Sequence, residues 1–177
     1  MEKGARRSST TAIVLIIVVT FFMVVLGLKE WVSSNSSATT EPKLNKIGIT
    51  VPFNHGRYTV KEVKESNEYN GQKTENKFVI VTVEVENSSN KPIFVSGDQF
   101  VLIDEKGNNY LRDGMRDASF GEKNPTFSIT DDLNPGVKRT GNVSFEVPVD
   151  VTDYQLAVRD NMFDFGGAEY IYFDLRR

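Results

Sequence analysis

The sequence predicts an antiparallel β-sandwich that is preceded by a single transmembrane helix. Two observations predict the sandwich. Hydrophobic residues recur with a period of two after residue 46, and turn-forming residues separate the alternating segments about every ten residues. One observation predicts the helix: residues 12–28 read AIVLIIVVTFFMVVLGL, with no charge and with Thr20 as the one polar side chain.

Residues 10–32 are long enough to span a membrane as a helix. A helix rises about 1.5 Å per residue, so this segment covers the roughly 30 Å hydrocarbon core of a bilayer. Three basic residues precede it: Lys3, Arg6 and Arg7. Directly after the uncharged run at residues 12–28, Lys29 and Glu30 cancel, so the positive-inside rule places residues 1–9 in the cytoplasm and the C-terminal part outside.

A cleaved signal peptide is the alternative interpretation of the same segment. Signal peptides combine a basic start, an apolar core of about 7–15 residues and a small-residue cleavage site. The apolar core is longer here, and the one fitting site, Ser36-Ser37-Ala38, lies well beyond it. We therefore expect a retained anchor in the cell membrane, and the alternative is secretion after cleavage near Ala38. The chain contains no Cys, so no lipid can be attached through a thioether.

Composition divides the rest into a linker, residues 33–45, and one extracellular domain, residues 46–177. The linker begins SSNSSATT, which is too polar to bury a core. The whole chain carries a formal charge of −3, and residues 1–29 hold four basic groups and one acidic group (+3), so the remainder carries −6. We expect no nucleic-acid partner, because such binding depends largely on neutralising phosphates.

The clearest predicted strand lies within residues 77–87. Val79, Val81, Val83 and Val85 fall on one face, whereas Phe78 and Ile80 on the other face give way to polar residues. This pattern indicates one fully buried face and a second face covered only at its start. Further strands are expected at residues 47–51, 57–63, 99–104, 109–112, 141–147, 154–158 and 169–175. Residues 111–133 are weakly patterned and form either a long functional loop or one that hides a strand at residues 126–130.

Turn signals separate these strands. Gly107 between apolar runs predicts a hairpin over residues 104–108, and Asn134-Pro135-Gly136 predicts a tight turn. The change of phase between Val60 and Val63 indicates a β-bulge.

Three motifs link the chain to a known family: KFVIVTVEVENSSNKPI, FVLIDEKGNNY, and LNPGVKRTGNVSFEVP followed by YQLAV. In these motifs the chain resembles a bacterial domain family of unknown function, over residues 47–175. Its members are secreted or membrane-tethered and share an immunoglobulin-like sandwich with the mycobacterial immunoprotective extracellular antigen. The resemblance implies an immunoglobulin-like fold and carries no catalytic residues over to this chain.

The sequence contains no catalytic motif. His55 is the only His and lies in a loop before a strand, and one His without Cys cannot build a zinc site of His and Cys ligands. Aspartates occur in pairs: Asp113 and Asp117, Asp131 and Asp132, Asp150 and Asp153, Asp160 and Asp164. Turn capping is the expected role of these pairs. A calcium site in one loop and a glycosidase carboxylate pair are the alternatives.

We expect a membrane-anchored binding module at the cell envelope, with no enzymatic activity and no cofactor. Residues 10–32 contact the membrane, and the other partner is a protein or a cell-wall component. Met162, Phe163 and Phe165 form the candidate partner-binding loop, although the same side chains would also fit as a plug for the open end of the sandwich. The alternative functions are a secreted antigen-like protein, an envelope component that self-associates through sheet edges, and a carboxylate-based extracellular hydrolase.

Overall fold

The computed structural model describes residues 42–112, 126–127, 131–159 and 169–176. All of them belong to one unit of the chain, Pro42–Arg177. Within these residues no helix is long and apolar enough to cross a membrane. The predicted anchor at residues 10–32, the cytoplasmic residues 1–9 and residues 33–41 of the predicted linker lie outside the described part of the chain.

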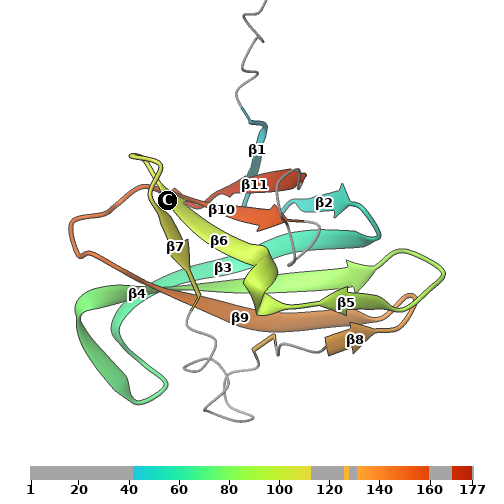
Figure 1. Ribbon diagram of the computed structural model, residues 1–177, viewed down its shortest axis with the longest axis horizontal. Helices are drawn as coiled ribbons and strands as arrows, with labels where there is room; N and C mark the ends of the chain where they lie inside the picture. Colours follow the sequence, from blue (N-terminus) through green and yellow to red (C-terminus); the bar gives the residue numbers. More distant parts are fainter. Residues whose placement is uncertain (1–41, 113–125, 128–130, 160–168, 177) are drawn as a thin grey trace, which may run out of the picture. The chain divides into compact units, whose positions relative to one another are not determined.

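The described residues form the predicted all-β sandwich (Figure 1). Sheet A has the strand order β1-β11-β10-β6-β7. Its strands are β1 (Leu44–Lys46), β6 (Phe100–Asp104), β7 (Asn109–Leu111), β10 (Tyr154–Arg159) and β11 (Tyr170–Asp174). Neighbours are antiparallel except β1 and β11, which are parallel. A short 3₁₀ helix, η1 (Gly97–Gln99), precedes β6.

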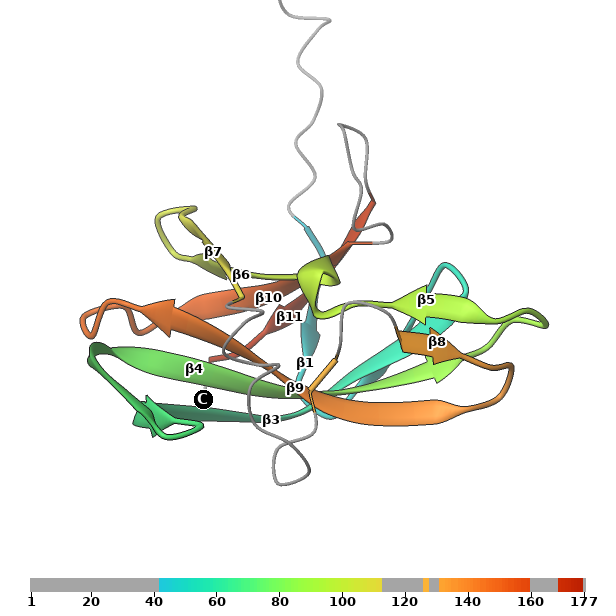
Figure 2. The same ribbon diagram turned by 60° about the horizontal axis from the view of Figure 1, so that its bottom comes forward.

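Sheet B has the order β2-β3-β4-β9 and is antiparallel throughout. Its strands are β2 (Thr50–Phe53), β3 (Gly56–Tyr69), β4 (Gln72–Asn87) and β9 (Lys138–Val147). In Figure 2, β3, β4 and β9 lie on one side of the sandwich, and β6, β7 and β10 lie on the other. A separate ribbon pairs β5 (Ile93–Val95) with β8 (Asp131–Leu133).

The predicted valine alternation is confirmed in the core. Val79, Val81, Val83 and Val85 of β4 have no exposed surface, and they belong to one apolar cluster that includes Leu102 and Phe173 from sheet A. The rings of Tyr58 and Phe100 meet across the two sheets with centroids 6.5 Å apart. Burying one such side chain contributes about 1.5–3 kcal/mol, so this cluster is the main source of stability.

Two predictions about the strands need correction. Residues 47–51 do not form one strand, because Gly48 adopts a φ of +83° and separates β1 from β2. The expected strands at 57–63 and 77–87 continue into one long hairpin that turns at Asn70-Gly71. Thr126 forms a bridge with Asn142, and residues 128–130 of the alternative strand at 126–130 lie outside the described residues. The predicted bulge is confirmed as a register shift between Val60 and Glu62.

One buried amide joins the loops at one end of the sandwich. The Asn87 side chain, which has no exposed surface, donates from Nδ2 to the carbonyl oxygens of Lys91 and Leu133, both at 2.7 Å. Its Oδ1 accepts from the backbone N–H of Ser89 at 2.9 Å and from the Ser89 hydroxyl at 2.8 Å. Asn87 therefore connects the loop after β4 to the end of β8.

We expect Asn87→Ala to lower the free energy of unfolding by about 3 kcal/mol. The buried carbonyl oxygen of Leu133 would lose its partner, which costs about 1–3 kcal/mol, and the part-buried bonds to Lys91 and Ser89 would be lost as well. Urea unfolding of residues 42–177 measures the change. Asn90→Ala is the matched control, because Asn90 is exposed in the same loop. Equal losses in the two variants would contradict the role of Asn87.

Candidate binding site

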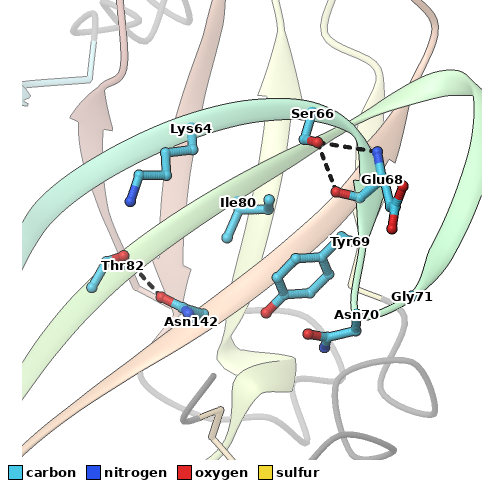
Figure 3. A pocket seen from close by; sticks show the side chains of 9 residues that line it. All are labelled: Lys64, Ser66, Glu68, Tyr69, Asn70, Gly71, Ile80, Thr82 and Asn142. Carbon is cyan, nitrogen blue, oxygen red and sulfur yellow. Dashed lines mark hydrogen bonds between the residues drawn. The ribbon is translucent and has the colours of Figure 1, made fainter. Parts of the chain in front are cut away.

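A depression on the outer face of sheet B is the candidate binding site (Figure 3). It has a volume of about 470 Å³, within the roughly 300–1,000 Å³ typical of small-molecule sites. Its lining comes from β3, the following turn, β4 and β9: Lys64, Ser66, Glu68, Tyr69, Asn70, Gly71, Ile80, Thr82 and Asn142. Ile80 and Thr82 alternate along β4 with the buried valines, so the depression lies on the face opposite the core.

A second irregularity in β3 shapes one wall of this depression. The register shifts between Ser66 and Glu68. The Ser66 hydroxyl donates to the Glu68 carbonyl oxygen at 2.7 Å and accepts from the Glu68 N–H at 3.1 Å. Because a bulge increases strand twist, we infer that this shift turns the end of the hairpin over the outer face. Tyr69 then packs against Phe78, with ring centroids 6.3 Å apart, and forms a second buried cluster with Phe78 and Ile80.

Asn70 and Gly71 form the two-residue turn between β3 and β4, and both residue types tolerate the positive φ that this turn needs. Asn70 and Gly71 have φ values of 51° and 75°, respectively. Two-residue hairpin turns of type I′ need a positive φ at both central residues, and Asn-Gly is the preferred pair. This turn places the Asn70 side chain at the edge of the depression beside Tyr69 (Figure 3).

The polar groups of the lining are held in place by bonds to their neighbours. Thr82 and Asn142 are paired across β4 and β9, and the Thr82 hydroxyl donates to Asn142 Oδ1 at 2.8 Å. This bond orients the Asn142 amide through Oδ1, and the two N–H donors on Nδ2 take no part in it. The Lys64 Nζ lies 2.9 Å from Glu62 Oε2, and Glu68 Oε2 lies 3.6 Å from the Lys73 Nζ. Each charge of the lining thus has a counter-charge just outside it.

A smaller cavity of about 180 Å³ borders sheet A. It is lined by Leu44, Asp104, Glu105, Asp153, Tyr154, Gln155 and Arg176. Asp104 accepts bonds from the N–H of Lys106 at 2.9 Å, from both nitrogens of Asn108 at 2.8 Å, and from the Tyr110 hydroxyl at 3.0 Å. This carboxylate therefore holds the β6–β7 hairpin together, which explains the Asp-x-x-Gly-x-x-Tyr spacing of the sequence motif.

These bonds change the acidity of Asp104. Burial raises the pKa of the carboxyl group, but the hydrogen bonds from Asn108, Tyr110 and the Lys106 N–H together outweigh it. The pKa of Asp104 consequently lies below its ordinary value of 3.8. Burial, together with the hydrogen bond to Asp104, raises the pKa of Tyr110.

Of the other residues singled out from the sequence, the structure describes His55 but not the candidate partner-binding loop. His55 is exposed in the β2–β3 turn, as expected, and its carbonyl oxygen accepts from the Ser88 N–H at 3.0 Å. In the described part of the chain, no three His, Asp or Glu side chains are placed to hold a metal ion. The candidate loop residues Met162, Phe163 and Phe165 lie outside the described residues, as do four of the paired aspartates: Asp113, Asp117, Asp160 and Asp164.

Sequence reasoning missed the depression on sheet B, although two local signals pointed to it. Phe78 and Ile80 are apolar on the outward face of β4, which indicates that something covers that face. The Asn70-Gly71 pair marks the hairpin that supplies the covering Tyr69. The pairing of Thr82 with Asn142, sixty residues apart, has no local signal.

Solved structures with the same fold come from several bacteria. The yjhA protein from Bacillus subtilis is 20% identical, with a TM-score of 0.56 over 75% of this chain and 99% of that protein. The secreted protein MPT63 from Mycobacterium tuberculosis is 15% identical, with a TM-score of 0.55 over 77% of this chain and 99% of that protein. A putative lipoprotein from Bacillus subtilis, ycdA, is 17% identical, with a TM-score of 0.52 over 71% of this chain and 38% of that protein. At these identities the likeness establishes the fold.

The sequence comparisons agree with the structural ones. The family profile described as "Domain of unknown function (DUF4352)" matches residues 45–169. No curated protein sequence matches the chain. The profile covers most of the sandwich and includes the three motifs that carry the resemblance seen in the sequence.

We expect the contribution of Asp104 to stability to depend on pH. Its pKa is lower in the folded than in the unfolded chain, so ionised Asp104 stabilises the fold above about pH 4, and this stabilisation is lost as the pH falls through the folded pKa. The difference in unfolding free energy between wild type and Asp104→Asn should therefore shrink below about pH 4. Urea unfolding of residues 42–177 at several pH values measures it. The exposed Asp150→Asn is the control, and a difference for Asp104→Asn that is constant in acid would contradict the expectation.

Proposed function

The chain belongs to this family of domains of unknown function, and on that premise we propose that it is a membrane-tethered, extracytoplasmic binding module without enzymatic activity. The location is supported by two proteins of the same fold, one described as secreted and one as a putative lipoprotein. An acidic, cysteine-free sandwich after a long apolar segment fits the same location.

The proposed tether is the apolar segment at residues 10–32, with residues 1–9 in the cytoplasm. Residues 33–43 would then be the linker between the membrane and the sandwich, because Leu44 and Asn45, which the sequence assigned to the linker, pair with β11 as part of β1. A flexible chain of this length has a typical end-to-end distance of about 20 Å. Cleavage near Ala38 is the competing outcome, and it would release the sandwich as a secreted protein.

The observation that carries the binding role is the depression on the outer face of sheet B. Its lining presents hydroxyl and amide groups whose orientation is fixed by bonds such as Thr82 to Asn142. The alternative, a carboxylate-based hydrolase, uses a pair of carboxyl groups beside its substrate, whereas Glu68 is the one carboxylate among the described residues of this lining. These features support a role in holding a ligand, and we expect no catalysis from this lining.

Cysteine labelling tests the location and the site together, because the native chain contains no Cys. Three single variants are required: Ser8→Cys before the anchor, Lys64→Cys in the depression and Lys106→Cys in the exposed β6–β7 turn. On intact cells, we expect a membrane-impermeant maleimide to label positions 64 and 106, and to label position 8 only after permeabilisation. If a ligand occupies the depression, labelling of position 64 on cells should be at least about fivefold slower than on purified protein, with no such slowing at position 106.

Each part of the proposal can fail separately in this experiment. Labelling of position 8 on intact cells would contradict the orientation. Recovery of labelled protein that begins near Thr39 in the medium would contradict the anchor. Equal labelling ratios at positions 64 and 106 would contradict binding at the depression.

A further inference from the structure

We propose that the depression on sheet B binds an uncharged saccharide chain through one or two of its rings. This inference rests on the proposed binding role of the same surface and adds the class of ligand. Three properties of the lining lead to it: the balance of its charges, the kind of hydrogen-bonding groups it offers, and the small extent of its apolar surface.

The balance of charges disfavours an ionic ligand. Lys64 and Glu68, the two charged residues of the lining, are each paired with a neighbour outside it, at 2.9 and 3.6 Å. The same pattern continues along the outer face of sheet B. Glu86 lies 3.7 Å from Arg57 and 3.3 Å from Lys138, and Glu84 lies 3.7 Å from Lys61. An anion or a cation would meet charges of its own sign as often as opposite ones, so this face offers neither of them electrostatic complementarity.

The hydrogen-bonding groups suit hydroxyls. A sugar hydroxyl both donates and accepts, and the amides of Asn70 and Asn142 carry both a donor and an acceptor. The Thr82 hydroxyl fixes Asn142 through Oδ1, and this leaves the Asn142 N–H groups to donate to a ligand. The Tyr69 hydroxyl points toward the end of the depression where Asn142 lies, and the Lys64 ammonium points toward Thr82 (Figure 3).

The apolar floor is too small for a hydrophobic ligand. Ile80 and Tyr69 are the apolar side chains of the lining, and they are only 9% and 6% exposed. Sites for drug-like molecules are lined mainly by hydrophobic and aromatic groups with few polar ones, which is the reverse of this composition. A saccharide ring needs only a small apolar contact for its C–H groups, and its hydroxyls would form hydrogen bonds with the polar groups of the lining.

Titration of the full chain in lipid nanodiscs with three neutral trisaccharides tests the ligand class. The probes are chitotriose, maltotriose and cellotriose, and trigalacturonate is the charged comparison. We expect at least one neutral probe to bind saturably by calorimetry and trigalacturonate to bind at least about tenfold more weakly. Asn142→Ala and the more conservative Thr82→Val should each weaken binding by about tenfold, because each removes a hydrogen-bonding group of the wall.

Matched variants outside the depression separate a local effect from a general one. Asn109→Ala on β7 of sheet A and Thr140→Val on β9 change exposed residues of the same types, and they should leave the affinity unchanged. The proposal is overturned if no neutral probe binds at millimolar concentration, if trigalacturonate binds as tightly, or if Asn142→Ala behaves like Asn109→Ala. Slowed labelling of position 64 on cells together with no trisaccharide binding would keep the binding role and reject the saccharide.

Discussion

The binding face of sheet B depends on Asn87, whose backbone bonds the residues before β9 and whose buried side chain bonds the neighbouring loops. Its backbone N–H donates to the Val137 carbonyl oxygen at 3.1 Å, and its carbonyl oxygen accepts from the Gly136 N–H at 3.0 Å. β9 therefore starts beside the end of β4 in one register, with Glu86 opposite Lys138 and Thr82 opposite Asn142. A slip of one residue would turn Asn142 toward the core and Val143 toward solvent. The position of Asn142 in the wall of the depression thus depends on the backbone bonds that Asn87 makes where β4 ends and β9 begins.

Two bulges in β3 decide which of its residues face the core. After the shift between Val60 and Glu62, Val63 points inward and Glu65 follows on the same face. Glu65 bonds there to the hydroxyl of Tyr154 in sheet A and to the Lys77 Nζ at 3.0 Å, a polar contact between the two sheets. The second shift, between Ser66 and Glu68, directs Tyr69 onto Phe78 instead. One strand can therefore contribute both to the core and to the wall of a site on the outer face.

Much of this fold could be predicted because its signals are local. The alternation from Val79 to Val85, the phase change after Val60 and the Asn134-Pro135-Gly136 turn each lie within a few residues. The split at Gly48 was missed because its φ of +83° breaks the alternation of Ile47, Ile49 and Val51, which looks continuous in the sequence. The role of Asn87 was missed because its partners, Lys91 and Leu133, are set by the tertiary fold. The depression was missed for the same reason, since it needs the pairing of Thr82 with Asn142.

A tethered domain does not need a deep pocket to bind a polymer. An open depression with a polar lining forms few contacts per ligand, so each single contact is expected to be weak. Many copies held on one membrane, facing a ligand with repeated units, convert later binding events into local ones and raise the overall affinity by about 10²–10⁴. The proposed anchor and the proposed saccharide site therefore reinforce each other. The tether raises the local concentration of the domain, and the repeated rings of a glycan offer several binding sites to neighbouring copies.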